Sequence, residues 1–283
     1  MSRKSINKVM TAAEAIDRFV VDEATVGIGG QTIGRCSMVL AQEIVRQRKK
    51  NLTLVGCSMS ISMDMLVGAG LVTRTECGTG NVELYGATMQ WRKAIEQGRL
   101  VNLDHSHLTM ALRFLAGSLG LPFMPSKSLL GTDILNKKTL DINQEPFKQI
   151  DNPWNKGEPV VLLPKLNPDV SIIHAQQADK TGNFVLQGFT THEPEMAKAS
   201  NSVIVSCEEL VTTDFIKQHP ERTTVPYLYV DAVVPQRWGA FPTSVYGHYE
   251  HDDAHIKYYQ LCAKAGGETY DRYLEENVYK CET

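Results

Sequence analysis

Short apolar segments that end at glycines alternate with helical segments along this chain, and this alternation limits the folds open to it. Apolar runs at residues 24–28, 52–55 and 71–77 are each followed directly by a glycine. Helical patterns follow at residues 38–47 and 64–68. Apolar strands separated by helices are typical of parallel sheets that are covered on both faces. We therefore predict an α/β fold with an open, mostly parallel twisted sheet and helices on both faces.

The rest of the chain continues the same pattern. Further apolar runs predict five strands, and three longer segments with helical spacing predict helices. A length of 283 residues suits one large α/β domain, so we predict a single domain over residues 1–283. The predicted strands are residues 160–163, 170–174, 183–186, 202–206 and 227–234, and the predicted helices are residues 107–119, 253–265 and 268–279.

One stretch interrupts this pattern. Residues 125–158 are polar and contain Pro146, Pro153 and Gly157. A structureless connection of this length is uncommon inside a compact domain. We expect these residues to form an excursion over the surface or an arm that contacts a partner.

Charge and composition argue against several classes of function. The net charge is −3 with both signs interspersed, so we expect no nucleic-acid partner and no membrane partner. The first residues lack the apolar core of a secretory signal. The six cysteines are scattered without a C-x-x-C pair, which favours neither disulfides nor a metal site. We expect a reduced, cytoplasmic location and no metal.

The segment Val-Gly-Ile-Gly-Gly-Gln-Thr-Ile-Gly-Arg-Cys-Ser at residues 26–37 is the first candidate for chemistry. A strand that ends in glycines and opens a helix exposes backbone N–H groups that can bind a phosphate or stabilise an oxyanion. The amides of Gly29, Gly30 and Gln31 are the candidates. A plain tight turn is the alternative. The segment has neither the dinucleotide-binding nor the P-loop fingerprint.

A second glycine-rich segment, at residues 77–86, contains Asn81 and Glu83. A carboxylate in a crevice there could act as an acid, a base or a ligand of a polar substrate, and Asn81 is a candidate substrate ligand beside it. The alternative is that Glu83 is a solvated loop residue.

Histidines occur in two further segments. His174 follows an apolar strand, where a hydrogen-bonded structural histidine is more common than a catalytic base. In the run Asp104-His-Ser-His107 a metal site would need further ligands, so capping of the following helix is the favoured interpretation. A glycine- and aromatic-rich loop at residues 238–247 can be explained by structure alone.

Taken in order, these segments resemble the α subunit of class I CoA-transferases of the glutaconate CoA-transferase type. Residues 29–37 resemble the family pattern Gly-Gly-Phe-x-x-x-Arg-x-Pro, with Arg35 retained, Gln31 in place of the phenylalanine and Ser37 in place of the proline. The resemblance covers nearly the whole chain. The other matching segments are residues 64–70, 121–125, 172–178, 207–209, 230–234 and 239–242.

The resemblance implies the fold shared by CoA-transferases and some sugar-phosphate isomerases. It also implies a homologous β subunit, in a heterodimer or an α2β2-type assembly, with the active site between the two chains. Coenzyme A, as acyl-CoA, would be the substrate, and CoA would pass to a carboxylic acid. The family nucleophile is a β-subunit glutamate in a Ser-Glu-Asn-Gly setting, which this chain lacks. Neither Glu208 nor Glu209 is read as the nucleophile, so we expect the chain to be inactive without its partner.

Within this family the role left to the chain is to line the acyl pocket. The resemblance assigns the oxyanion to the backbone of Gly29, Gly30 and Gln31, and a substrate carboxylate to Arg35, whose fork binds carboxylates bidentately. Ser37 belongs to the same candidate set. Glu83 falls at the position of a pocket serine in glutaconate CoA-transferase, and its charge would disfavour a second substrate carboxylate.

Two other functions are compatible with the same resemblance. One is decarboxylation of an acyl-CoA, or carbon–carbon or ring-opening hydrolysis of a CoA thioester, in which Glu83 would be the first candidate for a catalytic residue. The other is a non-catalytic, ligand-sensing or scaffold role. Fold alone does not choose among them.

Overall fold

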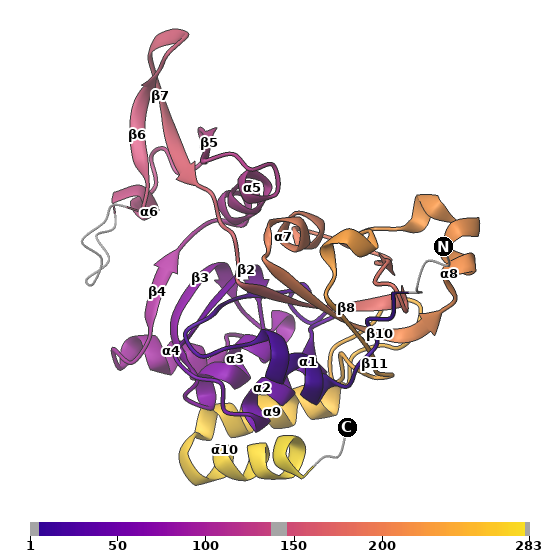
Figure 1. The fold of residues 1–283 in the computed structure, drawn as a ribbon. Coiled ribbons are helices and arrows are strands. Elements are labelled where there is room, and N and C mark those ends of the chain that lie inside the picture. The colour runs from indigo at the N-terminus through magenta and orange to yellow at the C-terminus, as the bar shows by residue number, and fades with distance from the viewer. Residues whose placement is uncertain (1–5, 137–145, 281–283) are drawn as a thin grey trace.

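A computed structural model describes residues 6–136 and 146–280, and its centre is an eight-stranded sheet (Figure 1). Seven strands follow the order β11-β10-β8-β1-β2-β3-β4, and every neighbouring pair among them is parallel. The predicted open, mostly parallel sheet is therefore confirmed. The strands are β1 (Thr25–Ile28), β2 (Leu52–Met59), β3 (Val72–Gly80), β4 (Val101–Asp104), β8 (Val170–Asp179), β10 (Ser202–Val211) and β11 (Ala232–Pro235), with β9 (Phe184–Val185) antiparallel to β8.

Helices cover both faces of this sheet (Figure 1). On one face an apolar cluster joins the sheet to six helices, and on the other a second cluster joins it to α5 and α7. The first helix begins after Thr11, its N-cap, whose side chain forms a capping box with that of Glu14. The six helices are α1 (Ala12–Phe19), α2 (Met38–Arg46), α3 (Ile61–Gly68), α4 (Met89–Glu96), α9 (Asp253–Ala265) and α10 (Gly267–Leu274), and the opposite pair is α5 (His107–Ser118) and α7 (Glu193–Ala199).

The strand order reverses at β1. From β1 the chain builds β2, β3 and β4 on one side, and later places β8, β10 and β11 on the other. In open α/β sheets, ligands bind beyond the carboxyl ends of the strands at such a reversal. The crevice beyond the ends of β1 and β8 is therefore where this architecture favours a site.

The polar excursion contains regular structure. β5 (Phe123–Ser126), β6 (Lys148–Asn152) and β7 (Asn155–Pro164) form an antiparallel sheet that stands away from the main sheet, beside the short helix α6 (Asp133–Asn136) (Figure 1). Leu129, Phe147, Val161 and Leu163 give it a small apolar core of its own. The strand predicted at 160–163 exists, but it belongs to this sheet and not to the parallel one.

Other predictions need correction. The strand predicted at 227–234 is a 3₁₀ turn at Tyr227–Tyr229 followed by β11, since the Tyr229 N–H donates back to the Pro226 carbonyl and the Val230 N–H to the Tyr227 carbonyl. The strand predicted at 183–186 is shorter and antiparallel. The helix predicted at 268–279 is confirmed, as α10 continued by a π-helical turn at Glu275–Tyr279, whereas the short helix α8 (Thr213–Gln218) after β10 was not predicted. In the described ranges no helix has both the length and the apolar character needed to span a bilayer.

Candidate functional site

A cavity of about 380 Å³ lies at the loop that follows β1, beside the reversal of strand order. Segments that are far apart in the sequence converge on it: the loop after β1, the turn after β3, the segment after β9 and the loop after β11. Gln31, Arg35 and Glu83, three of the predicted site residues, are brought together here. The lining residues are Gln31, Thr32, Gly34, Arg35, Glu83, Gln187, Phe189, Ser244 and Tyr246.

Three residues that line this cavity have left-handed backbone conformations. Thr32 has φ 47°, Glu83 has φ 50° and Arg35 has φ 52°, although none of them is glycine. Such conformations are costly for residues with a Cβ, and they persist where the surrounding structure fixes them, often at functional sites. The concentration of these conformations around one cavity distinguishes it from the other hollows of the protein.

Hydrogen bonds within the chain hold the loop at residues 29–37. The Gly29 N–H donates to the Ile172 carbonyl at 2.9 Å, and the Gln31 N–H donates to the Gly34 carbonyl at 2.9 Å. The Gly30 N–H donates to Glu193 Oε1 at 2.9 Å. The three amides predicted to bind an oxyanion thus donate within the chain, and binding an oxyanion would require these bonds to open. That assignment stays a prediction.

Arg35 is held by Glu193, a residue that the sequence analysis missed. Arg35 Nη1 donates to Glu193 Oε1 at 3.0 Å and Arg35 Nη2 donates to Glu193 Oε2 at 2.6 Å. The same guanidinium donates to the carbonyls of His174 and Phe189. Burial opposes ionisation of Glu193, but the charge and hydrogen bonds of Arg35 outweigh it and lower the pKa of this carboxyl group. The fork predicted to bind a substrate carboxylate therefore binds a carboxylate of the protein.

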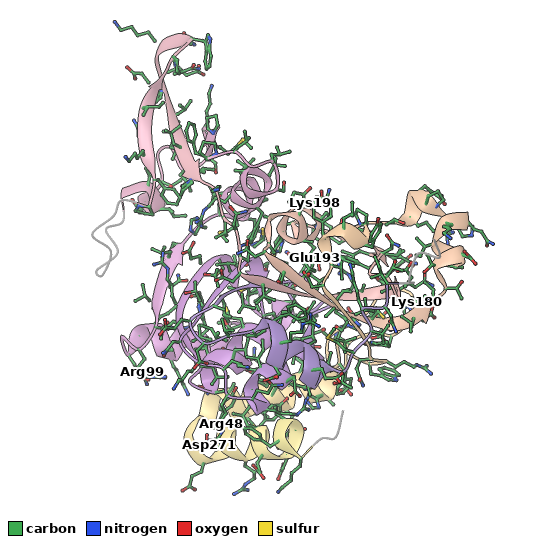
Figure 2. All side chains as sticks on the ribbon, in the orientation of Figure 1. Arg48, Arg99, Lys180, Glu193, Lys198 and Asp271 are labelled. Carbon is green, nitrogen blue, oxygen red and sulfur yellow. The ribbon has the colours of Figure 1, made fainter. Side chains whose placement is uncertain are left out.

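Glu193 gives little sign of this role in the sequence. It starts α7, and acidic residues are common in the first turn of any helix. In the structure its side chain has 0% exposure, and Figure 2 places it in the interior, whereas Lys198 of the same helix lies at the surface. Only the packing of α7 against the sheet reveals the pair, because 158 positions separate the two residues.

A buried glutamine connects two segments that line the cavity, one at Gln187 and the other at Tyr246. Gln176 on β8 donates from Nε2 to the carbonyls of Gln187 and Tyr246, at 3.0 and 3.3 Å, and its Oε1 accepts the Gln187 N–H at 3.0 Å. Two further backbone bonds join the loop after β1 to the loop after β11: the Arg35 N–H donates to the Ser244 carbonyl, and the Ser244 N–H donates to the Ile33 carbonyl. The backbone groups of these walls are therefore engaged in hydrogen bonds within the protein. The side chains that line the cavity are the groups that can contact a ligand.

Glu83 sits in a braced turn at the rim. Its N–H donates to Asn81 Oδ1 at 3.1 Å, and its carbonyl accepts the Gly86 N–H at 3.0 Å. Gln260 of α9 donates to the carbonyls of Tyr85 and Ala87, which ties the turn to that helix. Asn81 thus shapes the turn and does not line the cavity. The exposed carboxylate of Glu83 has no bonding partner among residues 6–136 and 146–280.

Ser37 and His174 lie in the interior. Ser37 is fully buried and its hydroxyl donates to the Ile172 carbonyl at 3.1 Å, so it supports the start of α2. His174 is bonded through Nδ1 to the Ser206 hydroxyl and through Nε2 to Glu208 Oε1, both at 2.8 Å. Burial lowers the pKa of this imidazole. Tyr249 also donates to Glu208, at 2.6 Å, so His174 is part of a satisfied buried cluster.

The run at residues 104–107 divides into separate roles. Ser106 caps α5, as expected for this run. His105 is buried beside Arg113 and Glu76, and burial lowers its pKa to about 3. His107 is exposed and bonded through Nε2 to the Thr79 hydroxyl at 2.9 Å. In the part of the chain that the structure describes, no group of three or more side chains is arranged to hold a metal ion.

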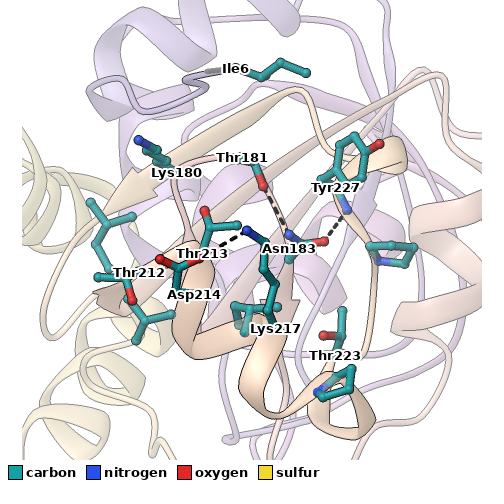
Figure 3. A pocket seen from close by; sticks show the side chains of 15 residues that line it. Ile6, Lys180, Thr181, Asn183, Thr212, Thr213, Asp214, Lys217, Thr223 and Tyr227 are labelled. Carbon is teal, nitrogen blue, oxygen red and sulfur yellow. Dashed lines mark hydrogen bonds and ion pairs between the residues drawn. The ribbon is translucent and has the colours of Figure 1, made fainter. Parts of the chain in front are cut away.

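A larger cavity of about 1030 Å³ lies near the carboxyl ends of β8 and β10 (Figure 3). Its polar groups are largely engaged with one another: Lys217 pairs with Asp214 at 3.1 Å, and Asn183 accepts the Tyr227 N–H at 2.9 Å. It lies beyond Lys180, past the end of β8 and away from the reversal at β1. Position and backbone strain therefore favour the smaller cavity as the functional site.

Comparison with known proteins places the chain in one family. Residues 9–236 match the Coenzyme A transferase family. The chain is 34% identical to the α-type chain of glutaconate CoA-transferase from Acidaminococcus fermentans, over 97% of this chain and 88% of that one. The solved structure of that organism's glutaconate coenzyme A-transferase superposes with a TM-score of 0.92 at 33% identity, over 97% of this chain and 90% of that chain.

Two other proteins are similar along most of this chain. An uncharacterised protein of Archaeoglobus fulgidus is 37% identical over 98% of this chain, which spans 61% of that protein's length. The structure of a variant of the decarboxylase AibA/AibB superposes with a TM-score of 0.81 at 29% identity, over 95% of this chain and 98% of that chain.

Proposed function

Because the chain belongs to the coenzyme A transferase family, we propose that it is the α subunit of a heteromeric enzyme that moves CoA from an acyl-CoA to a carboxylic acid. The observation that carries this proposal is the cavity at the strand reversal, where Gln31, Arg35 and Glu83 meet on strained, braced backbone. A homologous β subunit would complete the site. The five described cysteines are free and buried, which supports a reduced, cytoplasmic setting.

The proposed nucleophile is a glutamate of the β subunit. That carboxylate attacks the thioester carbonyl, the C–S bond breaks, and CoA leaves as the thiolate while a mixed anhydride forms. The thiolate then attacks the glutamyl carbonyl, which releases the first carboxylic acid and leaves CoA on the enzyme. The acceptor carboxylate reverses both steps and departs as the new acyl-CoA.

This chain would supply the wall of the acyl pocket. The side-chain amides of Gln31 and Gln187 and the hydroxyl groups of Thr32, Ser244 and Tyr246 can hydrogen-bond to a polar acyl group. Arg35, paired with Glu193, would position the loop and Phe189. Holding the acyl group in one orientation is the contribution to rate expected of such a wall.

Intact-mass spectrometry tests this proposal. The chain would be purified with the product of its neighbouring gene and incubated with a panel of acyl-CoAs. We expect a covalent CoA adduct on the partner and none on this chain. Absence of both turnover and an adduct, with a folded complex, would overturn the proposal.

Decarboxylation or hydrolysis of an acyl-CoA is the second candidate. The similarity to the decarboxylase AibA/AibB and the free carboxylate of Glu83 at the cavity favour it. The same experiment separates the two functions: turnover that releases CO₂ or a hydrolysis product, without an adduct on the partner, would identify the second.

A further inference from the structure

The charges around the cavity do not balance. Arg35 and Glu83 are the two charged side chains among its nine lining residues. The positive charge of Arg35 is neutralised by Glu193, whose two carboxylate oxygens accept hydrogen bonds from the guanidinium. Glu83, the other charged group, has no cation bonded to it within residues 6–136 and 146–280. The cavity of this chain therefore carries one uncompensated negative charge.

The backbone that carries this charge is held in one conformation. Glu83 has φ 50°, and the Asn81 side chain and the Gly86 N–H hold its turn in that conformation. The contacts of Gln260 with the carbonyls of Tyr85 and Ala87 join this turn to α9. A carboxylate on a mobile loop could turn away from an anionic ligand, but this one starts from a braced backbone.

The other seven lining residues are uncharged, and Phe189 among them is apolar. They offer the amides of Gln31 and Gln187 and the hydroxyl groups of Tyr246 and Ser244. Neutral donors and acceptors suit hydroxyl or carbonyl groups, whereas a carboxylate in a confined site needs a cation or several converging N–H groups.

We propose, on the basis of the proposed function, that Glu83 determines specificity by excluding acyl groups that carry a second carboxylate. It favours acyl groups with a neutral hydrogen-bond donor, such as a hydroxyl, at the distal end. The Glu83 carboxylate accepts a hydrogen bond from that hydroxyl and repels a carboxylate at the same place. The substrate class is thus a hydroxylated monocarboxylic acyl-CoA and not a dicarboxylic one.

Three acyl-CoAs of equal chain length test the inference in the complex with the partner chain: glutaryl-CoA, 5-hydroxypentanoyl-CoA and pentanoyl-CoA. For the wild type we expect kcat/KM for 5-hydroxypentanoyl-CoA to exceed that for glutaryl-CoA by about tenfold or more. Glu83→Gln, which keeps the shape and removes the charge, is expected to raise kcat/KM for glutaryl-CoA by about tenfold and to leave pentanoyl-CoA nearly unchanged.

Two matched variants serve as controls. Glu83→Asp keeps the charge and is expected to keep the discrimination against glutaryl-CoA. Glu221→Gln, at an exposed site outside the cavity, is expected to leave all three substrates unchanged. Raised salt is expected to narrow the wild-type discrimination, since screening weakens the repulsion.

The outcomes separate the inference from the function on which it rests. Turnover of glutaryl-CoA as fast as 5-hydroxypentanoyl-CoA by the wild type, unchanged by Glu83→Gln, overturns the inference alone. No turnover of any panel member by the folded complex overturns the proposed function and the inference together.

Discussion

Arg35 and Glu193 form a buried ion pair in which both carboxylate oxygens accept from the guanidinium, at 3.0 and 2.6 Å. The pair joins the loop after β1 to α7, and Glu193 also accepts the Gly30 N–H. One carboxylate therefore fixes both a side chain and the backbone of the predicted substrate loop.

Removing the charge of Glu193 is expected to be strongly destabilising. Glu193→Gln leaves the buried guanidinium without a counter-charge, which should lower the free energy of unfolding by about 3–5 kcal/mol. Urea denaturation measures the change. The exposed pair Arg92–Glu96 is the control, because Glu96→Gln should cost less than about 1 kcal/mol. A loss of similar size in both variants would contradict the role given to Glu193.

Gly30 has a second constraint besides its φ of 88°. A Cβ at this position would lie 2.7 Å from the Arg35 carbonyl oxygen, whereas a Cβ at Gly98, with φ 67°, would meet nothing within 4 Å. Gly98→Ala should therefore lower the free energy of unfolding by about 1–2 kcal/mol, the cost of a left-handed alanine, and Gly30→Ala should lower it by clearly more. Equal shifts in thermal unfolding would mean that the loop relaxes without cost.

Gln176 is expected to control substrate affinity through the cavity walls. Gln176→Met leaves the Gln187 and Tyr246 carbonyls without their donor, so KM for the acyl-CoA should rise severalfold, with a stability loss of about 1–3 kcal/mol. Gln177, the next residue on β8, donates instead to Glu209. Steady-state kinetics of the assembled enzyme should show no comparable rise in KM for Gln177→Met.

Asp64 should make stability depend on pH. Burial raises the pKa of this carboxyl group to about 6, from 3.8, although the Trp91 N–H and the Tyr259 hydroxyl donate to it. A pKa raised by folding means that the folded state favours the protonated acid. The stabilisation is full below pH 3.8 and is lost as the pH rises through 6, by roughly 3 kcal/mol in total.

Comparison with Asp64→Asn isolates this effect. The difference in free energy of unfolding, wild type minus variant, should fall by roughly 2 kcal/mol between pH 4 and pH 7 in urea denaturation, because part of the total is already lost at pH 4. A difference that stays constant over this range would show that Asp64 does not titrate as described.

The sheet could be predicted because its signals are local. The apolar run before Gly29 marks the end of β1, and the runs before Gly56 and Gly78 mark β2 and β3, although both strands continue past those glycines. The capping box of Thr11 and Glu14 marks a helix start. Helices α4 and α7 were not predicted. They have eight and seven residues, and their buried side chains include Gln90 in α4 and Glu193 in α7, so neither has a long apolar stripe and tertiary contacts stabilise both.

The site could be predicted only in part. Gln31, Arg35 and Glu83 were identified from glycine-rich strand ends and from family resemblance, and the fold places all three on one cavity. The partner of Arg35 could not be identified, because Glu193 is distant in sequence and carries no motif. The acceptors of the Gly29 and Gly30 N–H groups, Ile172 and Glu193, likewise lie outside the loop, and the loop sequence does not specify them.

The hydrogen bonds that hold the loop at residues 29–37 affect the thermodynamics of substrate binding. The backbone entropy of this loop is lost once, when the protein folds, and need not be lost again at each turnover. Only side chains such as Gln31 and Tyr246 remain to be ordered by a substrate. The substrate should therefore bind to a preorganised site without rearrangement of the loop, which favours a high association rate constant. The heat-capacity change of binding should then reflect only the apolar surface that the substrate buries.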